Sequence, residues 1–344
     1  GGAGFIGSNY IINHLKTTSN NILNYDKLTY AGNLDNLALI ESNPNYSYKN
    51  GCISNYKQIS NLINTFKPDR IVNFAAESHV DRSIDGPMEF LKTNIIGVGT
   101  LLEGIRNYIN NNPNKGSDFK FLHVSTDEVY GSLDSNDTFT EQTPYDPSSP
   151  YSASKASSDH LVRAWHRTFG IPILITNCSN NYGPYQFPEK LIPLMIINCL
   201  NEKELPIYGD GKNVRDWLFV KDHCTAIDAV LNKGVIGETY NIGGNNEIEN
   251  IQIVMTICNI LDELHPRENN LKYSELIKFV TDRPGHDFRY AIDASKIMSS
   301  LDWKPKETFE TGIYKTIMWY INNKEWWSKI IDKDYKQQRL GLVT

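Results

Sequence analysis

The glycine-rich start of the chain is the feature that most constrains its fold. Gly1, Gly4 and Gly7 recur at every third position and run directly into the apolar helical pattern of residues 8–15. Glycines at this spacing permit a tight turn, a close approach of backbone to pyrophosphate, and close packing of a helix on a strand. The N–H groups at the helix start then face the phosphates. The sequence therefore predicts a phosphate-binding turn, and because such a turn follows a strand, we expect the chain to lack a short strand preceding Gly1.

An acidic residue ends the next apolar segment. Residues 22–25 read as a strand, and Asp26 follows them directly. A carboxylate about 20 residues beyond a glycine turn of this kind accepts a hydrogen bond from a ribose 2′-hydroxyl and repels a 2′-phosphate. Lys27 beside it acts in the opposite direction. The pair of features predicts NAD as cofactor, in preference to NADP.

Strand and helix patterns alternate through the first half of the chain. Buried-strand patterns cover residues 70–76, 119–125 and 171–176, and helical patterns cover residues 59–66 and 90–108. This alternation predicts an α/β fold with a Rossmann-type doubly wound parallel sheet. Ligands of such sheets bind at the carboxyl ends of the strands. The asparagine-rich stretch 107–114 predicts a loop.

The length of 344 residues predicts about two domains. We assign residues 1–177 to the Rossmann domain, without its first strand, and expect residues 216–245 to return to it. Prolines become frequent after residue 177. Residues 178–215 and 246–344 are therefore predicted to form a smaller α/β substrate domain.

A tyrosine and a lysine share the first turns of a predicted helix. Ser149 is a suitable N-cap and Pro150 a suitable first helical residue, which places Tyr151 in the first turn and Lys155 one turn later on the same face. A free tyrosine has a pKa of about 10, and a nearby ammonium favours the phenolate. Tyr151 is thus a candidate base that removes a hydroxyl proton while hydride leaves the carbon.

Two carboxyl groups end the predicted strand at residues 119–125. Thr126, Asp127 and Glu128 follow that strand directly. Elimination of water needs one charged and one protonated group at the same pH, so two carboxyls in different environments suit it. Together with Tyr151 and Lys155, they predict oxidation of a hydroxyl followed by proton transfers beside the new carbonyl.

Composition excludes several other classes of protein. A formal net charge of −6 argues against nonspecific nucleic-acid binding. No apolar run approaches the ~18 residues of a membrane span. Five scattered cysteines without a Cys-x-x-Cys pair favour reduced thiols and a cytoplasmic location. The eight histidines show no metal-ligand spacing, so no metal is predicted.

In these motifs the chain resembles the nucleotide-sugar 4,6-dehydratases of the extended short-chain dehydrogenase/reductase family, over nearly its whole length. The segments that carry the resemblance are Gly1 to Gly7, Asp26 to Asn33, Ala75 to Ser83, Ser125 to Gly131, Tyr151 to Lys155, Asn177 to Tyr185, Arg215 to Trp217, and Asp282 to His286. The family often has an acidic residue before the isoleucine at position 53, where this chain has Cys52. The resemblance implies that the smaller domain binds a nucleotide-diphosphate sugar and that the protein is a homodimer, in which helices 90–108 and 151 onward pack against their copies through Leu161, Val162 and Trp165.

The resemblance also implies roles for the catalytic residues. Tyr151, beside Lys155, would take the proton of the glucose 4-hydroxyl as NAD takes the C4 hydride, and Thr126 would hydrogen-bond near that oxygen. Glu128 would then remove the C5 proton, and Asp127 would protonate the departing C6 hydroxyl. Return of the hydride to C6 and of a proton to C5 gives a 4-dehydro-6-deoxy sugar on the route to deoxysugars such as rhamnose. The implied substrate is dTDP-glucose.

Two sets of binding residues follow from the same resemblance. The cofactor set is Gly1, Gly4, Phe5, Ile6, Gly7, Asp26, Lys27, Leu28, Thr29, Cys52, Ile53, Phe74, Ala75, Ala76, Ser78, Thr93, Tyr151, Lys155 and Asn181. The substrate set is Ser78, His79, Thr126, Asn180, Lys190, Leu191, Pro206, Ile207, Tyr208, Arg215, Asn250, Asp282, Arg283 and His286. Arginine suits a diphosphate because its planar fork bonds two oxygens at once.

Three alternatives stay open at the level of sequence. A UDP-glucose 4,6-dehydratase differs only in the base, and one methyl group in a pocket is worth about 1–3 kcal/mol. A nucleotide-sugar 4-epimerase would share the Tyr-Lys pair without needing Asp127 and Glu128, and GDP-mannose dehydratases usually keep the glutamate without the preceding aspartate. A non-catalytic NAD-binding regulator would typically have lost Tyr151 or Lys155.

Overall fold

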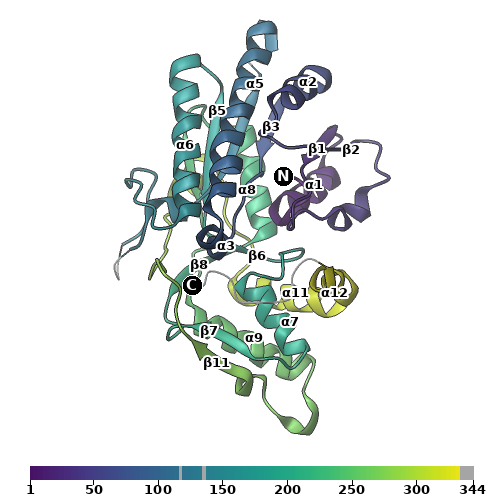
Figure 1. Cartoon of the computed structure of the whole chain (residues 1–344), viewed down its shortest axis with the longest axis vertical. Helices are drawn as coiled ribbons and strands as arrows, with labels where there is room; N and C mark the ends of the chain where they lie inside the picture. Colours follow the sequence, from purple (N-terminus) through teal and green to yellow (C-terminus); the bar gives the residue numbers. More distant parts are fainter. Residues whose placement is uncertain (116–117, 134–136, 334–344) are drawn as a thin grey trace.

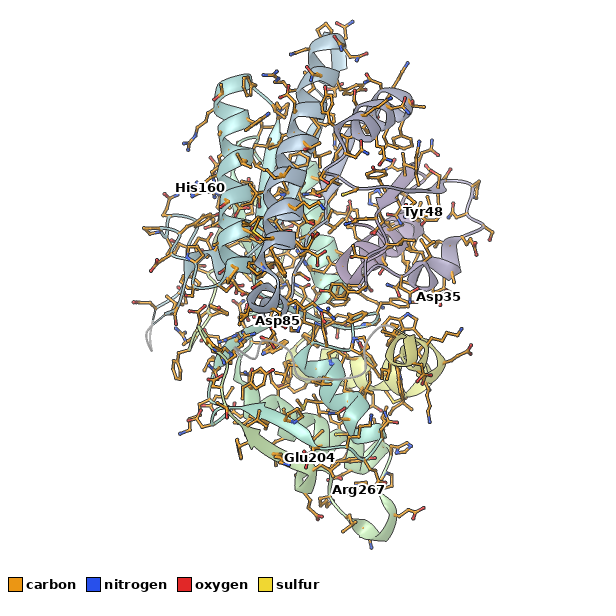
Figure 2. All side chains as sticks on the ribbon, in the orientation of Figure 1. Asp35, Tyr48, Asp85, His160, Glu204 and Arg267 are labelled. Carbon is orange, nitrogen blue, oxygen red and sulfur yellow. The ribbon has the colours of Figure 1, made fainter. Side chains whose placement is uncertain are left out.

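The computed structural model describes residues 1–115, 118–133 and 137–333 of the chain. Its architecture has two lobes, with the N-terminal half in the upper lobe and the segments around β7, β11, α7 and α9 in the lower one (Figure 1). In Figure 2, Asp85 lies at the junction between the lobes, whereas Glu204 and Arg267 lie in the lower lobe.

A parallel sheet forms the centre of the upper lobe. Its strands are β3 (Arg70–Asn73), β4 (Lys120–Thr126), β5 (Ile173–Cys178) and β9 (Thr239–Ile242), in that spatial order. β1 (Ile22–Asp26) pairs in parallel with β2 (Tyr46–Asn50) as a separate two-stranded sheet. A cavity of about 930 Å³ lies between β1 and β3. No strand of the described residues pairs with the edges that β1 and β3 turn toward this cavity.

Helices cover both faces of the sheet because its strand residues alternate between them. On one face, Phe121 and Ile173 pack against α2 (Tyr56–Phe66), α5 (Val98–Asn111) and α6 (Pro150–Phe169). On the other face, Leu122 and Leu174 pack against α1 (Phe5–Thr17) and α8 (Val220–Lys233). The predicted doubly wound α/β fold is confirmed.

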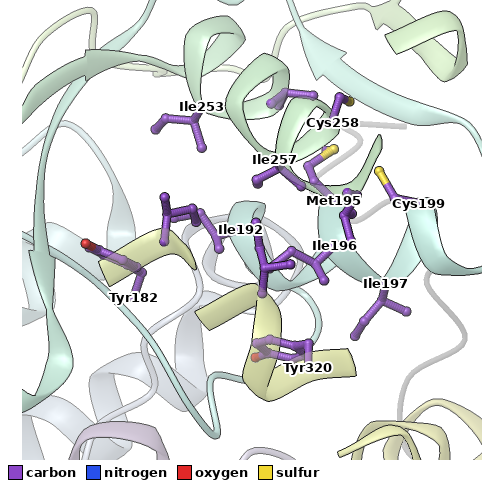
Figure 3. Packing of buried hydrophobic residues seen from close by; sticks show 14 of the residues in the cluster. Tyr182, Ile192, Met195, Ile196, Ile197, Cys199, Ile253, Ile257, Cys258 and Tyr320 are labelled. Carbon is purple, nitrogen blue, oxygen red and sulfur yellow. The ribbon is translucent and has the colours of Figure 1, made fainter. Parts of the chain in front are cut away.

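The lower lobe has its own apolar core. It contains the parallel pair β7 (Leu205–Tyr208) and β11 (Ile277–Val280), and the three-stranded sheet of β10 (Glu247–Glu249), β8 (Val214–Phe219) and β6 (Asn180–Tyr182). Its helices are α7 (Leu191–Leu200), α9 (Asn250–Leu264), α11 (Phe309–Asn322) and α12 (Lys324–Lys333). Figure 3 shows Ile192, Ile196 and Ile257 meeting in this core, with Tyr320 from α11 beside them.

Short elements connect the two lobes and the sheets. The helical ones are α3 (Val80–Asp85), α4 (Pro87–Phe90), a π-helical turn (Leu91–Gly97) that leads into α5, and 3₁₀ turns at Leu34–Ile40, Pro113–Lys115, Asp127–Tyr130, Glu268–Asn270 and Tyr273–Leu276. None of the helices in the described ranges combines the length and the apolar character needed to cross a bilayer.

Two expectations are corrected by the structure, and part of a third lies outside the described residues. α10 (Ser295–Leu301), expected in the smaller domain, packs instead against α8 and β9 of the upper lobe, because Ile297 and Leu301 are buried there. The asparagine-rich stretch begins in helix, since α5 continues to Asn111. Residues 334–344 of the predicted smaller domain lie outside the described residues.

Candidate active site

The glycine turn at the start of the chain is closely packed on all sides. A side chain at Gly7 would place its Cβ 2.5 Å from the Gly1 carbonyl oxygen, and one at Gly1 would place it 2.3 Å from the Ala75 nitrogen at the end of β3. Only glycine fits at both positions. α1 then begins at Phe5 with no side-chain cap and no acidic residue in its first turn. The N–H groups in the first turn of α1 are therefore available to an anion.

Asp26 joins this turn to the end of β1. Its carboxylate accepts hydrogen bonds from the Ala3 N–H at 2.9 Å and the Leu28 N–H at 2.8 Å. Leu28 has a left-handed backbone, with a φ of 53°. Two backbone donors thus hold the carboxylate at the mouth of a pocket that the glycine turn also lines.

One pocket collects almost the whole predicted cofactor set. The residues of that set that line it are Gly1, Gly4, Phe5, Ile6, Gly7, Asp26, Lys27, Thr29, Cys52, Ile53, Phe74, Ala75, Ala76, Ser78, Thr93, Tyr151, Lys155 and Asn181. Leu28 is the exception, since its side chain packs into a small core beneath the glycine turn. A glycine cradle, free helix N–H groups and a fixed carboxylate in one pocket fit a dinucleotide.

All five predicted catalytic residues line the same pocket. Thr126 is the last residue of β4, and its hydroxyl accepts the Glu128 N–H at 3.3 Å, which starts the turn carrying Asp127 and Glu128. On the facing helix, Ser149 and Ser152 form a capping box that fixes the start of α6. Tyr151 and Lys155 consequently enter the pocket from α6 while the acidic pair enters from β4.

The two carboxyl groups have different electrostatic surroundings. Asp127 is 1% exposed, and burial raises its pKa well above the ordinary value, with the charges of Glu128 and Asp216 adding to the effect. Burial also raises the pKa of Glu128, but Arg283, Lys190 and Arg215 oppose this increase. Asp127 therefore favours its protonated form while Glu128 is held closer to ionisation. The Asp127 Oδ2 is buried and has no hydrogen-bond partner among the described residues.

The expected effect of Lys155 on Tyr151 is not observed. Burial raises the pKa of Tyr151 well above 10, the charge of Glu128 adds to this, and the hydrogen bond with Thr126 opposes it. The Lys155 ammonium donates to the Val124 carbonyl at 2.8 Å and lies 3.3 Å from His123 Nε2. Desolvation of the buried phenol dominates in this structure, which corrects the expectation that the ammonium lowers its pKa.

The predicted substrate residues divide between the pocket and the lower lobe. Ser78, Thr126, Asn180 and Lys190 line the pocket. From the lower lobe, Arg283 donates to Asp81 of α3 at 2.7 Å, and the Tyr208 hydroxyl donates to the same carboxylate at 3.1 Å. The His286 ring meets Tyr208 edge-on and contacts Asp282 at 2.7 Å. Asp81 therefore joins the two lobes beside the site.

The remaining substrate candidates differ in burial. Arg215, on β8, is 5% exposed and stacks over the Tyr290 ring at 4.2 Å. Ile207 and Leu191 contribute to the core of the lower lobe, and Pro206 precedes Ile207 in β7. Buried polar atoms without hydrogen-bond partners among the described residues include His79 Nδ1, Asn180 Oδ1, Asn250 Oδ1 and Arg283 Nε. Such atoms usually have partners in a complete protein, so these fit a polar ligand.

Several residues of the pocket were not predicted from the sequence. Cys178, Gln186 and Glu189 line it, and Glu189 also accepts the Arg82 Nε–H at 2.7 Å. Asn94 lies in the π-helical turn. Its side chain accepts the Glu77 N–H and donates to the Glu77 carbonyl and to the Ser154 hydroxyl. Asn94 is a polar residue inside the apolar helical pattern 90–108, and this break in the pattern is the signal by which it could have been found.

In the part of the chain that the structure describes, no cluster of three or more His, Cys, Asp or Glu side chains could hold a metal ion.

Comparison with known proteins agrees with this geometry. The family model described as GDP-mannose 4,6 dehydratase matches residues 1–316. The dTDP-glucose 4,6-dehydratase of Escherichia coli is 57% identical over 356 residues, which cover 100% of this chain and 98% of the relative. The crystal structure of dTDP-glucose 4,6-dehydratase from Bacillus anthracis in complex with NAD has a TM-score of 0.85 and 48% identity, covering 96% of this chain and 97% of the other. A dTDP-glucose 4,6-dehydratase from Streptomyces venezuelae, also with NAD bound, has a TM-score of 0.88 and 43% identity, covering 96% of this chain and 98% of the other. The chain therefore belongs to the dTDP-glucose 4,6-dehydratases, within the extended short-chain dehydrogenase/reductase family.

Proposed function

We propose that this protein converts dTDP-glucose into dTDP-4-dehydro-6-deoxyglucose with NAD as its cofactor, as a hydro-lyase on the route to deoxysugars. The observation that carries the proposal is the position of Asp127 and Glu128, which face the pocket together with Tyr151 in a chain of this family. The relatives named above are dTDP-glucose 4,6-dehydratases, and two of their structures hold NAD.

Each step of the reaction has a residue suited to it. NAD, when bound, accepts the C4 hydride and returns it to C6 after water is lost, and a proton returns to C5 in that last step. Tyr151, from the start of α6, takes the proton of the 4-hydroxyl. Burial raises the pKa of its phenol, and the hydrogen bond with Thr126 opposes that increase. Once C4 is a carbonyl, the C5 proton is acidic, and Glu128 in its ionised form removes it. Asp127, kept protonated by burial, donates to the C6 hydroxyl as it departs as water.

The unlike pKa values of the acidic pair favour dehydration over epimerisation. A 4-epimerase removes and returns a hydride at C4 and loses no water, so it has no use for a protonated carboxyl beside an ionised one. A purely regulatory NAD-binding protein needs neither. Asp127 is 1% exposed. Burying an acid this completely costs free energy of folding, and such strongly perturbed groups cluster at functional sites.

A direct assay tests the activity and the base together. Full-length protein, NAD and either dTDP-glucose or UDP-glucose are incubated, and the products are identified by mass. We expect the dTDP sugar to lose one water and the UDP sugar to react more slowly, by about 10–200-fold, because one methyl group in a pocket is worth about 1–3 kcal/mol. Equal turnover of the two would reject thymine selectivity, and a product of unchanged mass would favour the epimerase.

We further propose that the protein is a homodimer through the face formed by α5 and α6, which lie side by side (Figure 1). Met88 and Ile96, on the helical segment that leads into α5, are 69% and 60% exposed. Leu161 and Trp165 of α6 are partly buried and remain candidates for this face. Val162 is fully buried against its own sheet, so its expected place in the interface is corrected.

Sedimentation of the full-length protein at micromolar concentration tests the dimer. We expect the mass of two chains for the wild type and of one chain for Ile96→Glu, because a charge in a packed apolar interface is costly. Tyr314→Glu, at an exposed aromatic position on α11, serves as the control and should stay dimeric. A wild-type protein that sediments only as a monomer contradicts the proposal.

A cytoplasmic location is our remaining proposal. All five cysteines, Cys52, Cys178, Cys199, Cys224 and Cys258, are free thiols, and four of them are buried. Free thiols are typical of reducing compartments.

A further inference from the structure

Polar side chains line one face of α6 from Tyr151 and Lys155 inward. Tyr151, Lys155, Asp159 and Arg163 are each four residues apart and so share a face of the helix. Lys155 is 3% exposed and Asp159 is 0% exposed. An ammonium and a carboxylate thus lie one turn apart in the interior of the upper lobe, behind the pocket.

The Asp159 carboxylate is only partly satisfied by hydrogen bonds. Its Oδ2 accepts the Ser125 hydroxyl at 2.8 Å and the Tyr145 hydroxyl at 2.9 Å. Its Oδ1 has no hydrogen-bond partner among the described residues and lies 3.4 Å from His123 Nε2. A carboxylate this deeply buried needs a compensating positive charge.

The Nε2 of His123 lies 3.3 Å from the Lys155 ammonium and 3.4 Å from Asp159 Oδ1, and the ring is neutral. The Asn73 Oδ1 accepts the Ala75 N–H at 3.2 Å, which turns the Asn73 amide nitrogen toward His123 Nδ1 at 3.1 Å. Nδ1 therefore accepts a hydrogen bond, and the proton of the neutral ring is on Nε2, which lies 3.1 Å from the Ser158 hydroxyl oxygen and 3.4 Å from Asp159 Oδ1. Burial lowers the pKa of His123 well below its ordinary value, and the charges of Lys155 and Arg163 lower it further. The ring supplies a dipole but no charge.

Asp159 is the group that supplies negative charge to Lys155. Burial lowers the pKa of Lys155, while Asp159 and then Cys178 raise it. Burial raises the pKa of the Cys178 thiol to about 12, so that thiol is uncharged at neutral pH. The effect is reciprocal: burial raises the pKa of Asp159, and Lys155 is the foremost charge that opposes this increase.

We propose that Asp159 is the buried counter-ion of Lys155, with both groups beside Nε2 of the neutral His123 ring, and that it is a positioning residue that keeps the ammonium protonated and fixed one helical turn from Tyr151. This inference rests on the proposed function in so far as Lys155 serves the cofactor and Tyr151. The titratable and charged groups that face Asp159 are Lys155 and Arg163 from α6, His123 from β4, Tyr130 from the 127–130 turn, and Tyr145 from the segment before α6.

The first test is the pH profile of the initial oxidation, followed as absorbance of enzyme-bound NADH. If Lys155 must be protonated, the rate falls as pH rises through its pKa. Asp159→Asn removes the charge that raises this pKa, so we expect the basic limb to move to lower pH by about one unit, a loss of about tenfold on that limb. Tyr145→Phe removes a hydrogen bond to the same carboxylate but leaves its charge, so its basic limb should stay in place. An equal loss for Asp159→Asn at every pH, with no shift of the limb, overturns the proposal.

The second test needs no activity and therefore separates this proposal from the proposed function. Melting temperatures are compared for Asp159→Asn, Lys155→Met, the double variant and the wild type. Each single change leaves one buried charge without its counter-ion, which is strongly destabilising, whereas removing both charges relieves the cost. We expect the double variant to melt above either single variant. A double variant that melts below both, by the sum of the single effects, rejects the pairing even if the enzyme proves to be a dehydratase.

Discussion

Tyr151→Phe will suppress the first oxidation by about 10²–10⁴-fold, because it removes the group that takes the 4-hydroxyl proton. Lys155, the other α6 residue among the described residues that line the pocket, donates from its ammonium to the Val124 carbonyl. The substitution removes a single oxygen from a ring that is 8% exposed, so it changes the packing little. Stopped-flow absorbance of NADH after mixing with dTDP-glucose measures the effect, since hydride leaves C4 only as that proton leaves.

A matched control uses a second buried tyrosine. Tyr130→Phe loses the hydrogen bond that its hydroxyl donates to Asn241 at 2.8 Å, and Tyr130 does not line the pocket. It should give a normal NADH transient. A normal transient in Tyr151→Phe would show that the proton leaves by another route.

Asp127→Asn will allow the first oxidation and slow the loss of water, by about 10²-fold or more. Asparagine resembles the protonated acid in shape and charge but has no proton to give to the departing hydroxyl. We therefore expect NADH to form at a normal rate and then to persist, where the wild type consumes it. Absorbance follows the NADH, and mass analysis of the quenched mixture identifies the 4-dehydroglucose nucleotide.

Glu128→Gln separates the two carboxyl roles. In D₂O the oxidised sugar should exchange its C5 proton in Asp127→Asn, because Glu128 remains as the base, and should not exchange it in Glu128→Gln. Exchange in both variants, or in neither, contradicts the assigned division of roles. The wild-type elimination should slow at low pH as Glu128 takes a proton, and at high pH as Asp127 loses one, because both pKa values are raised by burial.

Local sequence rules predicted the parts of the site that depend on the backbone. The glycine spacing identified the turn, and Ser149 with Pro150 gave the start of α6 at the correct residue. Strand alternation placed Asp127 and Glu128 at the carboxyl end of β4. These features are fixed by φ/ψ limits, capping and the period of two, all of which act over a few residues.

Features that depend on long-range contacts could not be predicted from the sequence. His123 sits between Asn73 and Asp159 because three distant segments converge in the interior. The pKa of Tyr151 is governed by how fully the fold excludes water, which no local pattern reports. α10 packs on the upper lobe because its apolar face meets β9, a strand more than fifty residues before it in the chain.

The cations around Glu128 link substrate affinity to proton uptake. Burial raises the pKa of Glu128, and Arg283, Lys190 and Arg215 oppose this increase; these are the side chains expected to meet the diphosphate. A diphosphate bound to them would offset their positive charge, so the pKa of Glu128 would rise on binding and the carboxylate would become a stronger base. The nucleotide would thereby activate the base that later acts on its own sugar. Where nucleotide binding is accompanied by uptake of this proton, linkage requires that lowering the pH tightens nucleotide binding.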